Sequence, residues 1–372
     1  MAVIAWALLP GKIAQGPLGF PCYSWTSSIN PQKEQKKTMK RQLLLIATAF
    51  VLASGMAIAG TKIVVTGMGP DAVRQIREAA GDATVVAADS ARLAAEVVDA
   101  EAIIGTITPE LFKAAPKLRW VQVYSAGVER YHFSELINSD VVLTNCKIIQ
   151  GPNIADHALG LLLALTRDLY RIIPKRTNEE WDRGEYRPIE LRGKTAVIVG
   201  VGGIGMQIAQ RAHAFDMKVI GVDPKDIPLS YFIERTVRPD RLDSVLPEAD
   251  VVFMAAPLTT ESQGMMSRRQ FGLMKKGSYF IAVSRGRTYD TDALVEALDS
   301  AVLAGAGLDV TNPEPLTKGH PLWKRQNVII TPHIAGQSDG VQGRRLALIL
   351  ENTARFRRGE PLLNVVDKKK GY

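Results

Sequence analysis

Three ionisable side chains stand at or just after the ends of predicted strands in the second half of the sequence: Arg285 in SRGR, Glu314 in NPEPL and His333 in TPHIAG. A guanidinium can hold a carboxylate through two parallel hydrogen bonds, and an imidazole can exchange a proton near neutral pH. A carboxylate near that imidazole favours its protonated form. Together these groups could bind a small hydroxy acid and move its hydroxyl proton.

Six apolar runs separated by helical stretches lead to these residues. The runs are KTAVIVG, MKVIGVD, ADVVFMAAP, GSYFIAVS, AGAGLDV and NVIITPH. Short apolar runs alternating with helices are typical of buried parallel strands, so the sequence predicts a doubly wound sheet of six strands. The carboxyl ends of such strands border the ligand crevice, where the three side chains would converge.

A glycine-rich loop, GVGGIG, follows the first of these runs. Gly200, Gly202 and Gly205 match the spacing of a dinucleotide-binding turn, and the helix expected at 204–215 follows. Gly203 and Ile204, within the same loop, are also expected to contact the cofactor. Asp223 ends the next predicted strand, where a carboxylate can accept hydrogen bonds from a ribose and repel a 2′-phosphate. The pattern therefore favours NAD over NADP, although the adjacent Lys225 could tolerate a phosphate. A glycine-rich turn without a ligand is the alternative.

The first half also alternates between the two element types. Strands are expected in KIVVTG, ATVVAA, AIIGT and VVLTNC, with helices at 71–80 and 91–100. One connecting helix is expected at 153–176, and a basic helix at 340–358. The stretch VYSAGVE places Ser-Ala-Gly after a strand, where backbone N–H groups could form an anion-binding nest or only a plain turn.

A secretion-signal pattern lies inside the chain. Lys40 and Arg41 precede a 17-residue apolar run that ends in Ala57-Ile58-Ala59, the small residues that a signal peptidase reads. Because a permanent span needs roughly 20 residues, we expect a cleaved signal at 39–59 and a disordered extension or misassigned start at 1–38. This predicts an exported or periplasmic protein, and a cytoplasmic one if the segment is not a signal. A mitochondrial transit peptide, the twin-arginine route and a membrane tether are alternatives.

The remaining 313 residues exceed what one core usually spans, so we expect two domains. The leader carries six Lys or Arg residues against one Glu, and its removal lowers the formal charge from +8 to +3. No nucleic-acid partner is indicated at that charge. Cys146 is then the single cysteine, which excludes an intramolecular disulfide and a cysteine metal cluster, and no metal site is predicted.

Residues from about 62 to 372 resemble the D-isomer-specific 2-hydroxyacid dehydrogenase family. The resemblance rests on motifs in one order: GKTAVIVGVGGIG, APLTTES, SRGRTYDTDALVEAL, AGAGLDVTNPEPL, HPLWKRQNVIITPHIAG and NVVDKKKGY. It implies an α/β fold of two Rossmann-like domains. A doubly wound NAD-binding domain at 153–333 would be inserted into a flavodoxin-like, substrate-binding domain made of 60–152 and 334–372.

The resemblance also implies roles for individual residues. Arg285 matches the arginine that binds the substrate carboxylate and carbonyl, His333 matches the acid/base, and Glu314 matches the glutamate paired with that histidine. Backbone groups that would grip the substrate carboxylate belong to Ser125, Ala126, Gly127 and Val128. Implied cofactor contacts, besides the glycine loop, Asp223 and His333, belong to Pro257, Thr259, Ser284 and Asp309. Two positions depart from the family pattern, Ala282 where Asn is frequent and Thr311 where Phe is frequent.

The resemblance implies interconversion of a 2-oxo acid and a D-2-hydroxy acid with NAD(H), by a homodimer. With the signal cleaved, no membrane span is expected in the mature form. The SAGVE loop and the GY terminus resemble broad-specificity members that reduce glyoxylate, hydroxypyruvate or pyruvate. Phosphoglycerate and phosphite oxidation are neighbouring activities. A protein that senses NAD(H) on the same fold without turnover is the alternative from another class, and it would not need His333.

Overall fold

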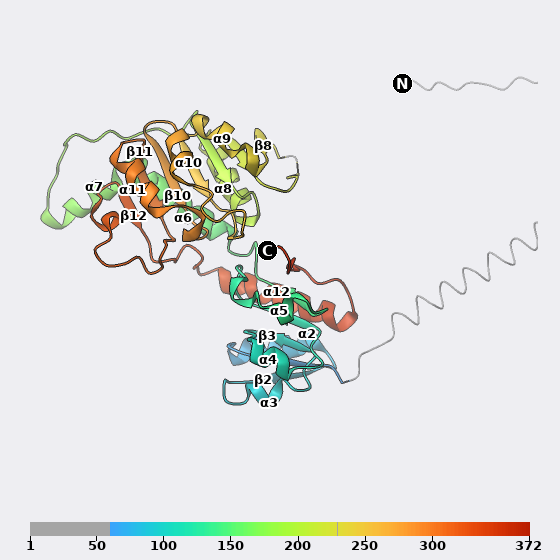
Figure 1. The fold of residues 1–372 in the computed structure, drawn as a ribbon. Helices are drawn as coiled ribbons and strands as arrows, with labels where there is room; N and C mark the ends of the chain where they lie inside the picture. The colour runs from blue at the N-terminus through green and yellow to red at the C-terminus, as the bar shows by residue number, and fades with distance from the viewer. Residues whose placement is uncertain (1–59, 229) are drawn as a thin grey trace, which may run out of the picture. The chain divides into compact units, whose positions relative to one another are not determined.

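A computed structural model describes residues 60–228 and 230–372. The expected extension and signal at 1–59 lie outside them. Two parallel β-sheets organise the described residues, one of five strands and one of seven, which confirms the α/β class (Figure 1). Helices across the described ranges are all too short or too polar to cross a membrane.

The five-stranded sheet has the order β2-β1-β3-β4-β5. Its strands are β1 (Lys62–Val65), β2 (Thr84–Ala87), β3 (Ala102–Ile104), β4 (Trp120–Gln122) and β5 (Val142–Thr144). The four apolar runs expected as strands are all present. β4 joins them and leads into Ser125, so the Ser-Ala-Gly stretch does follow a strand.

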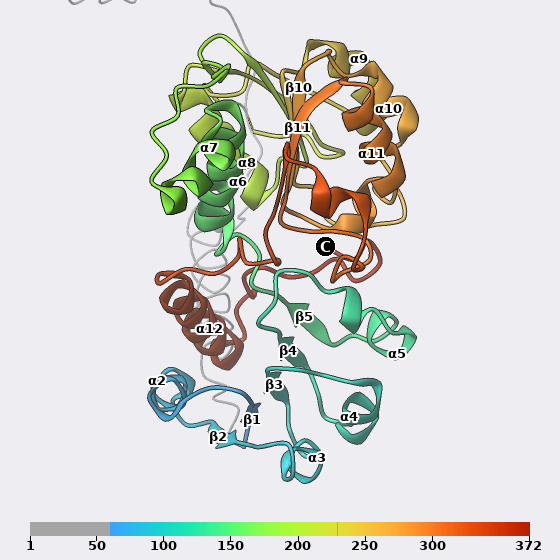
Figure 2. The ribbon, with the colours of Figure 1, turned by 90° about the vertical axis from the view of Figure 1, so that its left-hand side faces the viewer.

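Helices cover both faces of this sheet. α2 (Pro70–Ala80) and α12 (Val341–Arg358) pack on one face, so the C-terminal helix returns to the first sheet (Figure 2). Side chains of α3 (Leu93–Glu96), α4 (Pro109–Ala114) and α5 (Ser134–Ile137) pack on the other. The helix expected at 91–100 is therefore too long, because the chain leaves the helix at Val97 and buries that side chain in the core.

The seven-stranded sheet has the order β12-β11-β10-β9-β6-β7-β8. Its strands are β6 (Thr195–Val199), β7 (Lys218–Val222), β8 (Arg235–Val237), β9 (Val251–Met254), β10 (Ser278–Ala282), β11 (Leu303–Leu308) and β12 (Val328–Ile330). The six expected strands are present, but the count of six was wrong. β8 is a three-residue edge strand with exposed Arg235 and Thr236, so it lacks the apolar run that marks a buried strand.

The seven-stranded sheet is also covered on both faces. α6 (Gly151–Thr166) and α8 (Gly203–Ala214) pack on one face, and side chains of α9 (Leu242–Val245), α10 (Arg268–Leu273) and α11 (Thr291–Asp299) pack on the other (Figure 2). Short 3-10 helices complete the described chain: η1 (Glu129–Tyr131), η2 (Ile173–Asn178), η3 (Pro239–Arg241), η4 (Leu246–Glu248), η5 (Gly286–Thr288) and η6 (Pro321–Lys324).

The single helix expected at 153–176 is interrupted. α6 ends at Thr166, and Asp168 adopts a left-handed conformation with φ 56° before α7 (Leu169–Ile172) begins. The Asp168 carboxylate accepts a hydrogen bond from the Arg187 N–H at 2.8 Å, which offers the buried aspartate a partner outside the helix. Neither Gly nor Pro marks this break in the sequence. The apolar periodicity continues across it and therefore predicted one unbroken helix.

Candidate active site

The order of the strands arranges the expected site residues along one edge of the seven-stranded sheet. All its strands are parallel, so their carboxyl ends meet at that edge. Going from β12 through β11, β10, β9 and β6 to β7, the residues that follow the strands are His333, Asp309 with Glu314, Arg285, Pro257 with Thr259, the glycine loop and Asp223. The residues predicted to transfer a proton therefore lie at one end of the row. Asp223, the carboxylate predicted to contact the ribose, lies near the other.

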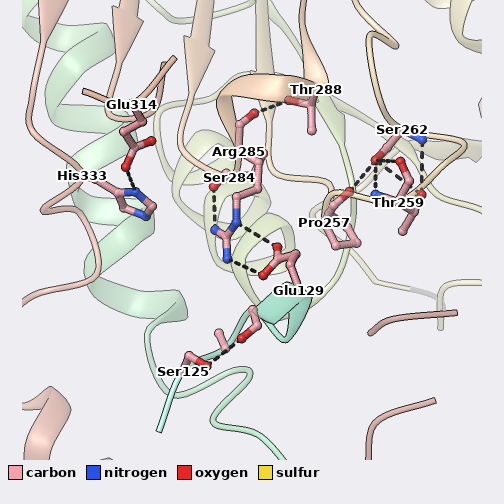
Figure 3. Close-up of polar contacts among 12 residues, drawn as sticks. Ser125, Glu129, Pro257, Thr259, Ser262, Ser284, Arg285, Thr288, Glu314 and His333 are labelled. Atoms are coloured by element: carbon pink, nitrogen blue, oxygen red, sulfur yellow. Dashed lines mark hydrogen bonds and ion pairs between the residues drawn. The ribbon is translucent and has the colours of Figure 1, made fainter. Parts of the chain in front are cut away.

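His333 and Glu314 form a direct pair (Figure 3). His333 Nδ1 lies 2.5 Å from Glu314 Oε1, and both side chains are about two-fifths exposed, at 44% and 41%. An ionised carboxylate can only accept, so Nδ1 carries the hydrogen. The ring's other nitrogen, Nε2, has no hydrogen-bond partner in the described part of the chain. It is therefore the atom available to exchange a proton with a ligand.

Asp309 anchors the turn that carries His333. Its buried carboxylate accepts hydrogen bonds from Thr331 Oγ1 at 2.6 Å and from the N–H groups of Ile334 and Ala335, both at 3.0 Å. The backbone of His333 has φ 53°, a conformation that is uncommon for residues other than glycine. Three bonds to one buried carboxylate hold the segment around this turn in place. The nicotinamide contact expected for Asp309 stays a prediction.

A second histidine supports this anchor. Thr331 Oγ1 donates its only hydrogen to Asp309, so it accepts from His157 Nε2, which lies 2.8 Å away. His157 belongs to α6, so the connecting helix braces the loop after β12. Thr331 and His157 were not expected at the site, and the polar Thr-Pro-His sequence is the only signal that could have suggested Thr331.

Arg285 lies against the loop after β4. Its Nε donates to Glu129 Oε1 at 2.9 Å, its Nη2 to Glu129 Oε2 at 3.4 Å and its Nη1 to the Ser284 carbonyl at 2.8 Å (Figure 3). A Cβ added to Gly127 would come within 1.9 Å of Arg285 Nη2. The expected arginine and the expected substrate loop are therefore brought together, with a glycine where they touch. Glu129 was not expected, although it directly follows the loop.

The loop itself has free donors. Its carbonyls are occupied: Ser125 O accepts from Cys146 N, Ala126 O from Asn145 Nδ2 and Gly127 O from Ser125 Oγ. The amide N–H groups of 125–128, by contrast, donate no hydrogen bond to any residue that the structure describes. Unpaired amides beside an arginine form a site suited to a carboxylate.

The glycine loop fits a bound dinucleotide. A Cβ added to Gly200 would come within 2.5 Å of Ala256 backbone atoms, and one on Gly205 within 1.9 Å of Gly200 O, so the turn is tight at both ends. A Cβ on Gly202, the N-cap of α8, would meet nothing within 4 Å. The open space lies at a helix N-terminus, where backbone N–H groups favour a phosphate.

Asp223, the residue predicted to contact the ribose, lies beside the glycine loop. Its Oδ2 accepts from Val201 N at 2.8 Å and its Oδ1 from Lys225 N at 2.9 Å, so the carboxylate is fixed beside the glycine loop. Each oxygen keeps a lone pair for a hydroxyl. The Lys225 ammonium lies 4.4 Å from the centre of the Tyr372 ring, a cation–π contact with the C-terminal residue.

Two serines complete the row. The buried Ser284 hydroxyl has no hydrogen-bond partner within the described ranges, so it is free for the cofactor contact that was predicted for it. Ser262 was not expected: its Oγ accepts from Thr259 N at 2.8 Å and donates to Pro257 O at 2.6 Å (Figure 3). It therefore fixes the loop in which Pro257 and Thr259 were predicted to cover the ribose.

The polar groups of the two residues that depart from the family pattern are paired where the structure gives their contacts. Thr311 is buried and its Oγ1 donates to Pro313 O at 2.8 Å. A Cβ on Gly286 would lie 1.9 Å from Thr311 O, so the loop after Arg285 packs directly on the loop that leads to Glu314. Ala282 is fully buried in β10, and its carbonyl accepts from Asp309 N at 2.9 Å.

Comparison with known proteins gives concordant matches. Residues 159–335 match the sequence model of the NAD-binding domain of D-isomer specific 2-hydroxyacid dehydrogenases. A glyoxylate reductase of Thermofilum pendens is 34% identical over 272 residues, which cover 71% of this chain and 79% of the relative. A D-3-phosphoglycerate dehydrogenase of Methanocaldococcus jannaschii is 30% identical over 82% of this chain, but the match spans only 59% of that protein.

Two solved structures are similar over nearly their whole length. One is an NADPH-dependent glyoxylate/hydroxypyruvate reductase of Sinorhizobium meliloti in complex with NADP and sulfate, with 27% identity and a TM-score of 0.71 over 84% of this chain and 100% of that one. The other is a D-lactate dehydrogenase of Aquifex aeolicus complexed with NAD and lactic acid, with 27% identity and a TM-score of 0.68 over 82% and 99%. Similar structures thus bind either dinucleotide.

Proposed function

The chain belongs to the D-isomer specific 2-hydroxyacid dehydrogenase family and is an oxidoreductase acting on a CH–OH donor with NAD(P), and from that premise we propose that it reduces a small 2-oxo monocarboxylic acid with NADH. The substrate class is glyoxylate, hydroxypyruvate or pyruvate. One observation carries the proposal: Glu314 occupies His333 Nδ1 and leaves Nε2 free at the sheet edge that also holds Arg285.

We assign a step to each residue. Arg285 and the free amides of 125–128 hold the substrate carboxylate and polarise its carbonyl. When bound, NADH supplies the hydride for the carbonyl carbon. Protonated His333 donates its Nε2 proton to the carbonyl oxygen, while Glu314 accepts from Nδ1 and stabilises the imidazolium. In the oxidation of a D-2-hydroxy acid, His333 takes up the hydroxyl proton instead.

The same reasoning assigns the two sheets. Substrate binding falls to 60–152 and 334–372, which contain the loop after β4, and cofactor binding falls to 153–333, which contain the glycine loop. NAD rather than NADP is proposed because Asp223 sets a fixed negative charge where a 2′-phosphate would lie. Assembly as a homodimer stays a prediction.

The experiment is the oxidation of NADH and NADPH by the purified protein with glyoxylate, hydroxypyruvate, pyruvate and longer 2-oxo acids, with His333→Ala and Arg285→Ala alongside. We expect histidine-dependent NADH turnover that is highest among the three short acids. Both variants should lose at least about 100-fold in turnover, the scale of a lost general acid or electrostatic group. Tight NADH binding without any turnover would instead identify a cofactor-sensing protein.

A further inference from the structure

Glu129 contributes an unexplained negative charge to the site. Its carboxylate pairs with Arg285, the group that is proposed to bind the substrate anion, and the two side chains are 42% and 32% exposed. A carboxylate beside a substrate-binding arginine lowers the net positive charge that the arginine presents to an anionic substrate. A glutamate beside it must therefore do something that outweighs the charge it neutralises.

The geometry shows which guanidinium donors remain. Of the five N–H donors of an arginine, Glu129 takes Nε and one hydrogen of Nη2, and the Ser284 carbonyl takes one hydrogen of Nη1. One N–H on each Nη is left. This is the pair that can hold a carboxylate end-on through two parallel hydrogen bonds. Glu129 thus braces the guanidinium by its Nε side and leaves a single bidentate position open.

We propose that Glu129 is a positioning and specificity-determining residue, which aims Arg285 at one substrate carboxylate and discriminates against substrates that carry a second anionic group. The inference rests on the proposed function, because it concerns the substrate of the same site. Glu129 lies across one guanidinium from the bound carboxylate, well inside the roughly 8–10 Å over which charges interact at physiological salt. Its charge therefore opposes a dianion more than a monoanion, and dicarboxylic or phosphorylated 2-oxo acids are disfavoured.

Oxamate and oxalate test this directly, because they have nearly the same size and differ by one negative charge. Each is titrated into the protein at saturating NADH by calorimetry, for wild type, Glu129→Gln and Glu129→Asp. Glu129→Gln removes the charge, so we expect the ratio of oxalate to oxamate affinity to rise about fivefold, the scale of one partly screened charge. Glu129→Asp keeps the charge but is too short to brace Arg285, so both affinities should fall while their ratio stays that of wild type.

A matched control is Glu296→Gln. Glu296 pairs with Arg268 through the same two guanidinium atoms, Nε and Nη2, away from the site. Its loss should leave the affinity ratio unchanged. A ratio that does not rise in Glu129→Gln, or a wild type that binds neither anion, overturns the inference.

The outcome is separable from that of the proposed function. Wild-type reduction of glyoxylate with an unchanged ratio in Glu129→Gln would overturn the role of Glu129 alone. A raised ratio in a protein that reduces no 2-oxo acid would support the role of Glu129 and overturn the proposed activity alone. Partial unfolding of a variant lowers both affinities together and does not move their ratio.

Discussion

His333 Nδ1 lies 2.5 Å from Glu314 Oε1, across the gap between the loops that follow β12 and β11. A carboxylate at this nitrogen fixes both the tautomer and the orientation of the ring. The two residues are nineteen positions apart in sequence and meet because β11 and β12 are neighbours in register. The pairing therefore depends on the sheet and on the anchoring of both loops.

His333→Ala should lower kcat for 2-oxo acid reduction by at least about 100-fold, and Glu314→Gln by about tenfold, because an amide can still orient the ring but does not stabilise the imidazolium. The dissociation constant for NADH, measured by fluorescence, should stay within about twofold in Glu314→Gln. In His333→Ala it should rise only a few-fold, because one predicted cofactor contact is lost while the glycine loop stays intact. His213→Ala, which removes an exposed histidine in the last turn of α8, is the control. Wild-type kcat in His333→Ala would refute the assignment.

The site residues that the sequence could predict are those that follow strongly apolar strands. Arg285, Glu314 and His333 each stand shortly after such a run, and a parallel sheet brings the ends of its strands to one edge. The glycine loop was predictable because two of its demands are local to the turn: Gly200 has φ 91°, and a Cβ on Gly205 would meet Gly200 O. The contact of Gly200 with Ala256, after β9, was not predictable from the local sequence. In these cases short-range sequence and strand order together determine the placement.

What could not be predicted depends on contacts between segments far apart in the sequence. Glu129 and Arg285 are 156 residues apart, and no local pattern at either position indicates the other. The edge strand β8 and the break at Asp168 likewise lack a marker, because an exposed three-residue strand has no apolar run and Asp168 finds its partner at Arg187. The Glu129–Arg285 pair and the break at Asp168 depend on hydrogen bonds between segments that are distant in the sequence.

Asp309→Ala should destabilise the protein and slow the reaction together. The substitution leaves Thr331 Oγ1 and the amides of Ile334 and Ala335 without their acceptor, at a cost of roughly 3 kcal/mol in unfolding free energy. Because the His333 turn loses its anchor, kcat should also fall about tenfold or more. Urea unfolding and steady-state kinetics measure the two effects. Wild-type stability in this variant would contradict the anchoring role.

Gly202→Ala should fold normally and bind NADH poorly. The new methyl group meets no protein atom within 4 Å, and the backbone at φ −75° suits alanine, so unfolding free energy should change little. The methyl group of the alanine would occupy the space that we assign to the pyrophosphate, so the dissociation constant for NADH should rise about 100-fold.

Gly69→Ala is the matched control for this substitution. Gly69 is the N-cap of α2, has φ −73° and has equally open space around it. Its helix packs on the five-stranded sheet, away from the glycine loop. It should leave NADH affinity unchanged. Equal affinities in wild type and Gly202→Ala would place the cofactor elsewhere.

Asp223→Asn should reduce the preference for NADH over NADPH by about tenfold, because it removes the charge that repels a 2′-phosphate while keeping the shape of the side chain. The measurement is the ratio of kcat/KM for the two cofactors. Asp250→Asn is the control: its carboxylate also accepts a backbone N–H, from Thr195 at 2.8 Å, but it stands at the opposite ends of the strands. A kcat/KM ratio unchanged in Asp223→Asn would mean that Asp223 does not discriminate the ribose of NADH from the 2′-phosphorylated ribose of NADPH.

Cys146 should make the protein sensitive to alkaline pH. Burial raises the pKa of its thiol to about 11 in the folded protein, against roughly 8.5 for an exposed thiol. The folded state thus favours the neutral thiol, and the resulting stability is complete below the unfolded pKa and is lost as the pH rises through the folded one. Between pH 8 and 11 the wild type should lose about 3 kcal/mol more unfolding free energy than Cys146→Ala.

Urea unfolding of both proteins at several pH values in that interval measures this difference. Groups away from Cys146 titrate alike in the two proteins, including Tyr279, whose pKa burial raises to about 12, so their contributions cancel in the comparison. Tyr124 is the exception, because burial and the charge on Cys146 both raise its pKa. The alanine removes the ionisable thiol but keeps a small apolar side chain at this fully buried position. Parallel stability curves would show that Cys146 can ionise without unfolding, which its burial and its hydrogen bond to Val123 O argue against.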